Sequence, residues 1–142
     1  MTTKTGSAVW KGGFKDGSGT ISTETGALNN APYGVASRFE SGQGTNPEEL
    51  IGAAHASCFS MAFSLMLGEA GFTPDEIRTS AKITLDKVAD GFAVTSSHLT
   101  VEARIPNIDE ARFSEIANQA KAGCPISKLL NTKITMDARL TT

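Results

Sequence analysis

The sequence predicts an α+β protein in which antiparallel sheets pack around a long buried central helix. Three observations support this prediction. Residues 47–70 are mostly apolar, strand-like runs occupy both sides of that segment, and glycine, asparagine and proline separate the runs. Strands and helices also come in blocks rather than in strict β–α–β alternation, which favours the α+β class.

Short β-type runs fill the first forty residues. They are separated by glycine, asparagine and proline, as expected for strands joined by turns. The predicted strands are Ala8–Trp10, Thr20–Glu24 and Tyr33–Phe39.

The central helix has a clear start and end in the sequence. Asn46 is a typical N-cap, Pro47 a typical first helical residue, and Glu49 stands where the return carboxylate of a capping box belongs. We predict a helix that reaches residue 69 or 70 and ends at Gly71 in a left-handed conformation.

This helix is apolar on nearly every side between residues 50 and 67, which is typical of a buried helix. A membrane span is the alternative interpretation. We reject it because no basic flank follows the helix and because small or polar residues interrupt it. The interrupting residues are Gly52, His55, Ser57, Ser60 and Ser64.

The C-terminal half alternates between strand and helix patterns. A hairpin turns at Asp90–Gly91, because two long alternating runs flank this tight-turn dipeptide. The predicted elements are strands at 81–88 and 92–105, helices at 109–121 and 125–130, and a closing strand at 133–140.

The length and charge of the chain limit its class. A chain of 142 residues fits one domain, because this size buries roughly 68–70% of the unfolded surface without help from a disulfide or a metal. No linker or repeat interrupts it, so we predict a single domain over residues 1–142. The net charge is −2 without a basic cluster, which gives no electrostatic basis for binding nucleic acid or an anionic membrane.

The first six residues lack the apolar stretch of a secretory signal. We therefore expect a cytoplasmic protein. In that reducing compartment a disulfide is more often catalytic or sensing than structural.

Two cysteines, Cys58 and Cys124, stand in segments that a compact fold can bring together. Cys58 lies about three turns into the central helix, beyond the reach of the helix dipole. Burial would raise the pKa of its thiol, so a nucleophilic Cys58 needs a cation from elsewhere. The candidates are Arg38, His55 and lysine or arginine residues of the other strands. A lone arginine is usually solvated, and His55 can be a small polar group in a tight helix.

Cys124 precedes Pro125, a typical first helical residue, which makes Cys124 a candidate N-cap facing unpaired backbone N–H groups. The pattern alone leaves two interpretations open, a redox-active pair or two inert core cysteines. A zinc site is disfavoured, because the spacing of Cys58, Cys124, His55 and His98 matches no metal motif.

The sequence resembles the osmotically inducible protein C (OsmC) family of hydroperoxide reductases over essentially its whole length. The most specific matches are the segment Thr-Asn-Pro-Glu-Glu-Leu-Ile-Gly-Ala-Ala-His-Ala at 45–56, the Cys58 that follows it, and Ala-Lys-Ala-Gly-Cys-Pro at 120–125. Residues 65–74 and Tyr33-Gly34 match the OsmC subgroup better than the related organic hydroperoxide resistance proteins.

The resemblance implies a thiol-dependent peroxidase without metal, haem or flavin. It implies that Cys58 is the peroxidatic residue and that Cys124 resolves its sulfenic acid into a Cys58–Cys124 disulfide. It also implies that Arg38 stabilises the thiolate and that Glu48 holds Arg38 through a bidentate pair. The family is dimeric, so we expect an intertwined homodimer with two active sites at the subunit interface.

We therefore expect an enzyme that reduces organic hydroperoxides, and hydrogen peroxide, during oxidative or osmotic stress. An apolar pocket around Cys58, formed by Phe59, Met61, Phe63 and residues of the partner, would accept an alkyl tail. The family suggests a dithiol reductant such as a lipoylated protein. The alternative is a redox-sensing stress protein that uses the same two thiols without turnover.

Overall fold

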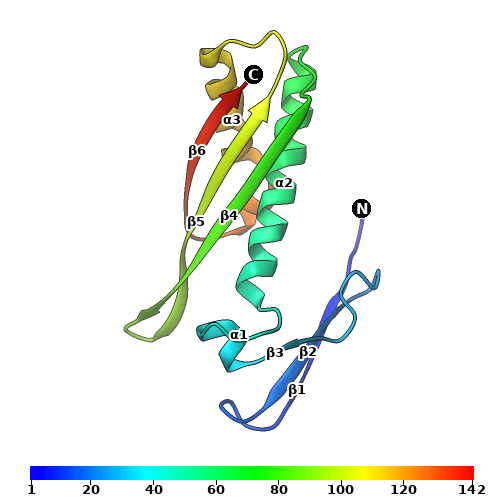
Figure 1. Cartoon of the computed structure of the whole chain (residues 1–142), viewed down its shortest axis with the longest axis vertical. Helices are drawn as coiled ribbons and strands as arrows, with labels where there is room; N and C mark the ends of the chain where they lie inside the picture. Colours follow the sequence, from blue (N-terminus) through cyan, green and yellow to red (C-terminus); the bar gives the residue numbers. More distant parts are fainter. The chain divides into compact units, whose positions relative to one another are not determined.

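The computed structural model describes all 142 residues and has the predicted α+β class (Figure 1). The chain divides into two compact units, Met1–Leu50 and Ile51–Thr142. The single domain that we expected over residues 1–142 stays a prediction. In chain order the elements are β1 (Gly6–Lys11), β2 (Ser18–Thr23), β3 (Ala31–Tyr33), α1 (Val35–Phe39), α2 (Pro47–Glu69), β4 (Glu76–Val88), β5 (Gly91–Arg104), α3 (Glu110–Gly123), α4 (Pro125–Leu129) and β6 (Lys133–Thr141).

The N-terminal unit contains a three-stranded antiparallel sheet in the order β1-β2-β3. The predicted strand Tyr33–Phe39 is wrong in most of its length, because β3 ends at Tyr33 and residues 35–39 form the short helix α1. The Ser37 side chain bonds back to Gly34 at the start of this helix. Its hydroxyl accepts a hydrogen bond from the Gly34 N–H at 2.9 Å and donates one to the Gly34 carbonyl at 3.1 Å. Such local side-chain bonds offer the backbone an alternative to the strand ladder.

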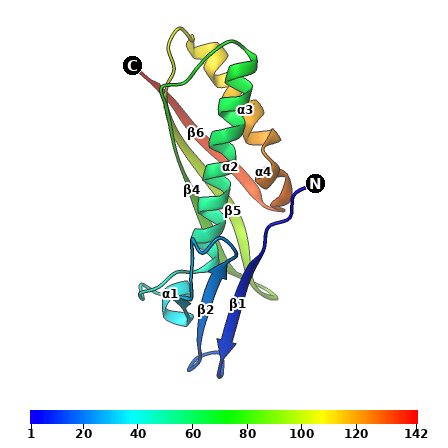
Figure 2. The ribbon, with the colours of Figure 1, turned by 90° about the vertical axis from the view of Figure 1, so that its right-hand side faces the viewer.

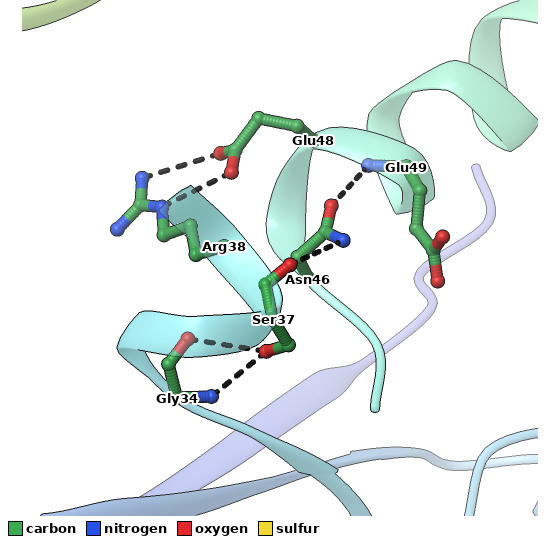
Figure 3. Close-up of polar contacts among 6 residues, drawn as sticks. All are labelled: Gly34, Ser37, Arg38, Asn46, Glu48 and Glu49. Carbon is green, nitrogen blue, oxygen red and sulfur yellow. Dashed lines mark hydrogen bonds and ion pairs between the residues drawn. The ribbon is translucent and has the colours of Figure 1, made fainter. Parts of the chain in front are cut away.

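The predicted boundaries of α2 are confirmed. Asn46 Oδ1 accepts the Glu49 N–H at 2.7 Å, so Asn46 is the N-cap (Figure 3). The Glu49 carboxylate accepts a hydrogen bond from the Thr45 hydroxyl at 2.8 Å instead of completing the expected capping box. At the other end, Gly71 has a φ of 91° and Phe72 N–H bonds to the Leu67 carbonyl at 2.8 Å, which together form a left-handed C-cap.

The C-terminal unit contains a second three-stranded sheet in the order β4-β5-β6. The predicted hairpin is confirmed, with β4 and β5 antiparallel from Glu76 to Arg104. The prediction of purely antiparallel sheets is wrong, because β6 runs parallel to β5. The physical reason is the connection between them, since α3 and α4 form a crossover that returns the chain to the starting end of β5.

The core of this unit lies between the sheet and the helices α2 and α3, which cover the same face of it (Figure 2). Phe63 of α2 and Phe113 of α3 pack edge to face, with ring centroids 5.8 Å apart. Both are fully buried, as are Leu99 and Val101 of β5. The alternating pattern of β5 therefore directs every second side chain onto the helices.

The expectation that α2 is buried on every side holds for one face only. Met61 and Leu65 on the other face are 77% and 65% exposed. By length and composition α2 could cross a membrane, although core helices of soluble proteins pass the same test. Gly52 belongs to the packed face, because a Cβ added there would lie 2.9 Å from the Ala81 carbonyl oxygen of β4.

Candidate functional site

The C-terminal unit brings the two cysteines together. Cys58 is half-buried on α2, Cys124 is fully buried, and both are free thiols. Burial raises the pKa of the Cys58 thiol, a hydrogen bond from the Ile126 backbone lowers it, and the neighbouring Cys124 side chain raises it further. The expected direction of the Cys58 pKa is therefore confirmed. None of the causes that act on this pKa is a cation.

Cys124 is the N-cap of α4, as the sequence predicted. Its Sγ accepts the Ser127 N–H at 3.3 Å, and Pro125 occupies the first turn of the helix. The thiol itself donates to Ser127 Oγ at 3.2 Å. Ser127 thus contacts the sulfur through both its backbone and its side chain, and the sequence analysis did not single it out.

His55 is fully buried and joined to two serines. Its Nδ1 lies 2.7 Å from Ser97 Oγ of β5, and its Nε2 lies 2.7 Å from Ser127 Oγ of α4. Burial lowers the pKa of His55 below its ordinary value of 6.5, so the ring is neutral at neutral pH. The sequence could have indicated Ser97 as a buried polar residue. It shares one face of the predicted strand with Leu99, Val101 and Ala103, and it alone of these four has a hydroxyl.

The N-terminal unit holds the predicted pair of Arg38 and Glu48 (Figure 3). Arg38 Nε donates to Glu48 Oε1 at 3.1 Å and Nη2 donates to Oε2 at 3.2 Å, a bidentate ion pair. The Glu48 side chain is only 11% exposed. Asn46 Nδ2 donates to the Ser37 carbonyl at 3.0 Å and so ties α1 to the start of α2, which fixes the two charged side chains opposite each other.

Arg38 also borders an aromatic cavity of about 270 Å³ within the same unit. Trp10 and Tyr33 pack with ring centroids 5.5 Å apart, and Phe14 and Phe39 pack at 6.2 Å. The guanidinium lies 5.3 Å from the centroid of the Phe39 ring. The cavity is lined by Trp10, Phe14, Tyr33, Gly34, Val35, Arg38 and Phe39.

The pocket that we expected around Cys58 includes residues of a partner subunit, and it stays a prediction. Within the single chain, Phe59 and Phe63 are fully buried in the core and Met61 is exposed on the opposite face of α2. An apolar helix does not indicate which of its faces is turned toward the core. The sequence analysis did not single out Trp10 and Phe14, which line the aromatic cavity of the N-terminal unit.

The sequence model of the OsmC-like protein family matches residues 40–139. The chain is 58% identical over 137 residues to peroxiredoxin OsmC of Escherichia coli, covering 96% of both chains. It is 30% identical over 103 residues to the organic hydroperoxide resistance protein of Xanthomonas axonopodis pv. citri, covering 70% of this chain and 68% of that protein.

Solved structures share the fold. An OsmC-like protein of unknown function from Vibrio cholerae superposes with a TM-score of 0.77 at 17% identity, covering 97% of this chain and 99% of the other. The organic hydroperoxide resistance protein OhrB of Bacillus subtilis superposes with a TM-score of 0.67 at 24% identity, covering 96% and 98%. At these identities the likeness concerns the fold alone.

Proposed function

Because the chain belongs to the OsmC-like protein family, we propose that it is a thiol-dependent peroxidase that reduces organic hydroperoxides, and hydrogen peroxide, in the cytoplasm. The observation that carries the proposal is the pair of free thiols, Cys58 and Cys124, close enough in one unit for the second to act on the pKa of the first. Relatives named as a peroxiredoxin and as organic hydroperoxide resistance proteins support the reaction type.

In the first step the Cys58 thiolate attacks the terminal peroxide oxygen. The O–O bond breaks, the alkoxide leaves and takes up a proton as the alcohol, and Cys58 becomes a sulfenic acid. In the second step Cys124 attacks the Cys58 sulfur, water leaves and a Cys58–Cys124 disulfide forms. A dithiol, such as that of a lipoylated protein, then reduces the disulfide by thiol–disulfide exchange.

Arg38 is the proposed source of the positive charge for the first step. Burial, Ile126 and Cys124 are the influences on the pKa of Cys58, and none of them is a cation. A guanidinium near the sulfur would favour the thiolate and polarise the peroxide. Glu48 would hold the guanidinium along its Nε–Nη2 edge, while Nη1 takes no part in this pair and would be available to the peroxide.

The aromatic cavity beside Arg38 is the proposed site for the organic part of the substrate. Its size of about 270 Å³ and its aromatic walls suit an aryl or short alkyl group. Hydrogen peroxide has no such group, so it would gain nothing from this cavity.

A homodimer is proposed because α2 exposes a continuous apolar face. This face is formed by small and apolar residues at helical spacing, which let two helices approach closely. Its members are Ala53, Ala54, Ser57, Met61, Ser64, Leu65 and Gly68. A second copy of the chain would cover it in a symmetric interface, with two active sites that use residues of both subunits.

Steady-state turnover tests the proposed function. The purified protein, cumene hydroperoxide and an excess of dithiothreitol or dihydrolipoamide should give continuous consumption of peroxide, and the Cys58→Ser variant should give none. A redox sensor that uses the same thiols would stop after one equivalent of peroxide per subunit. That result would refute the enzymatic proposal.

A further inference from the structure

A continuous chain of hydrogen bonds leads from the sulfur of Cys124 into the protein core. Cys124 Sγ contacts Ser127 Oγ at 3.2 Å, Ser127 Oγ contacts His55 Nε2 at 2.7 Å, and His55 Nδ1 contacts Ser97 Oγ at 2.7 Å. All four side chains are at least nine-tenths buried. They come from three elements, α4 with its N-cap, α2 and β5, so the tertiary fold holds the hydrogen-bonded chain together.

The thiol, the Ser127 hydroxyl and the neutral His55 ring each have one proton to donate, and this fixes the direction of each hydrogen bond. The Cys124 thiol has one proton and donates it to Ser127 Oγ. The Ser127 hydroxyl then points its own proton at His55 Nε2, which must be the unprotonated ring nitrogen. A neutral His55 keeps its proton on Nδ1 and donates it to Ser97 Oγ.

We propose that Ser127 and His55 take the thiol proton from Cys124 as Cys124 attacks the sulfenic acid of Cys58. Ser127 touches the reacting sulfur and is the catalytic residue of this step. His55 acts through Ser127 as the proton acceptor, and Ser97 positions its ring. The inference rests on the proposed function, because it concerns the step that closes the disulfide.

The Cys124 Sγ–Cys58 Sγ bond forms and the Cys58 S–O bond breaks. The thiol proton moves to Ser127 Oγ while the Ser127 proton moves to His55 Nε2. The oxygen leaves as hydroxide, which takes one proton from solvent, and His55 later returns one proton to solvent, so the net product is one molecule of water.

The surroundings of Cys124 explain why such an acceptor is useful. The thiol is fully buried and its hydrogen bond goes to Ser127 Oγ, so its proton must leave through a protein side chain. The printed contacts of the His55 ring are two hydroxyls, Ser97 of β5 and Ser127 of α4, and no charged group contacts it. The Cys124 thiol is the next group along the chain, bonded to Ser127. Burial is the cause of the lowered pKa of His55, so the ring is neutral and ready to accept a proton at neutral pH.

After the transfer the same atoms stabilise the product. The imidazolium donates from Nε2 to Ser127 Oγ, the Ser127 hydroxyl donates to the thiolate, and the Ser127 N–H already points at Sγ at 3.3 Å. Hydrogen bonds to an ionised sulfur are stronger than those to a thiol. The chain thus favours the attacking form of Cys124 without a permanent charge in the core.

Single-turnover kinetics with one equivalent of cumene hydroperoxide test the proposal. Dimedone trapping and mass spectrometry follow the sulfenic acid and the disulfide separately. In Ser127→Ala we expect sulfenic acid to form at the wild-type rate and the disulfide to close about 100-fold more slowly near neutral pH. Raising the pH should restore the rate of Ser127→Ala, because solvent hydroxide then removes the thiol proton, whereas the wild type should depend little on pH.

Further variants separate this role from a merely structural one. Ser127→Thr keeps the hydroxyl and should close the disulfide at close to the wild-type rate, while His55→Gln keeps hydrogen bonding without basicity and should show the steep pH profile of Ser127→Ala. Ser60→Ala is the control. It removes a hydroxyl of α2 that bonds to Thr79 and not to the Cys124–Ser127–His55 chain, so it should change neither step. Thermal unfolding of each variant confirms that it is folded.

The outcomes distinguish this inference from the proposed function. If the wild type forms no sulfenic acid, the proposed peroxidase function and this step fail together. If sulfenic acid forms normally and the disulfide closes with the wild-type pH profile in both Ser127→Ala and His55→Gln, only the proton-transfer inference is overturned.

Discussion

Arg38 and Glu48 face each other through two hydrogen bonds of 3.1 and 3.2 Å, one to each oxygen of the carboxylate. This arrangement uses two of the three guanidinium nitrogens and leaves Nη1 available. It also fixes the plane of the guanidinium, which a single contact would leave free to rotate. The pair therefore presents one oriented donor beside the aromatic cavity.

Arg38→Ala is expected to raise the pKa of Cys58 and to slow its first reaction with peroxide by about 100-fold or more. The reason is that burial already raises this pKa and no cation is among the causes acting on the thiol in the single chain, so the proposed site relies on Arg38 alone. Thiolate absorbance measured against pH in a Cys124→Ser background reports the change. Arg38→Lys should recover only part of the rate, because an ammonium group cannot form the bidentate pair.

The matched control is Arg139→Ala, which removes an exposed arginine paired with Glu102 on the second sheet. It should leave the titration of Cys58 unchanged. An unchanged titration in Arg38→Ala itself would exclude Arg38 as the activating residue.

The two cysteines should behave differently when each is replaced. Cys58→Ser is expected to consume no peroxide, while Cys124→Ser should reduce one equivalent and then stop as a sulfenic acid. The difference follows from their settings, since Cys58 is half-buried and Cys124 is fully buried behind it. Rapid-quench peroxide assays with mass spectrometry measure both. The reverse pattern would exchange the two roles.

Much of the fold could be predicted from the sequence, because the signals were local. The cap at Asn46, the stop at Gly71 and the hairpin turn at Asp90–Gly91 all lie within a few residues of the structure that they specify. The parallel placement of β6 could not be read in this way, since strand alternation is the same in parallel and antiparallel pairs. Residues 35–39 were predicted as a strand because valine and phenylalanine favour strands. They form a helix, in which the Ser37 hydroxyl makes two hydrogen bonds to the backbone of Gly34.

The candidate site was predictable where a motif carried it. Cys58, Cys124, Arg38 and Glu48 were all named from the sequence, and the Arg38–Glu48 ion pair is confirmed. The partners of His55 were not, because Ser97 and Ser127 lie 42 and 72 residues away from it along the chain. Side-chain contacts at such separations depend on the packing of whole elements, which spacing alone does not specify.

Phe14→Ala should weaken the binding of bulky substrates. The side chain lines the aromatic cavity and packs against Phe39, so its loss removes apolar contact with an aryl group. We expect the kcat/KM for cumene hydroperoxide to fall about tenfold, equivalent to about 1.4 kcal/mol, and that for hydrogen peroxide to stay constant. Phe92→Ala, at the tip of the β4–β5 hairpin, is the matched control. An equal loss for both peroxides would argue against a substrate site in this cavity.

The stability of the protein should fall in mild acid through His55. The unfolded chain protonates this histidine near its ordinary pKa of 6.5, whereas burial lowers the pKa in the folded state. Between these two values the unfolded state binds more protons, so the free energy of unfolding decreases as the pH falls. The loss amounts to about 1.4 kcal/mol for each unit by which the pKa is lowered.

Urea unfolding at a series of pH values from about 7 to about 5 measures this effect. His55→Gln should flatten the dependence, because it removes the group that titrates. His98→Gln removes the other histidine, which is bonded to Thr135 and Asp137, and keeps His55, so the contribution of His55 to the slope should remain. A slope that survives in His55→Gln would assign the acid sensitivity to another group.

The separation of Glu48 and Cys58 along α2 bears on which subunit completes each active site. Glu48 and Cys58 are ten residues apart on α2, and ten residues of helix span about 15 Å. An arginine paired with Glu48 would therefore struggle to reach Cys58 of the same chain. In a symmetric dimer of antiparallel α2 helices, Glu48 of one subunit comes level with Cys58 of the other. Each site would then take its thiols from one subunit and its ion pair from the partner.

Heterodimers of a Cys58→Ser subunit and a Glu48→Ala subunit, purified through two different affinity tags, distinguish the arrangements. If the subunits share their sites, one site carries both defects and the other is intact, so roughly half of the wild-type activity should return. Heterodimers of wild type with Cys58→Ser calibrate that level, since they too retain one intact site. Mixed dimers that stay inactive would place Glu48 and Cys58 of each site in the same subunit, and a chain that forms no dimers would refute the proposed assembly.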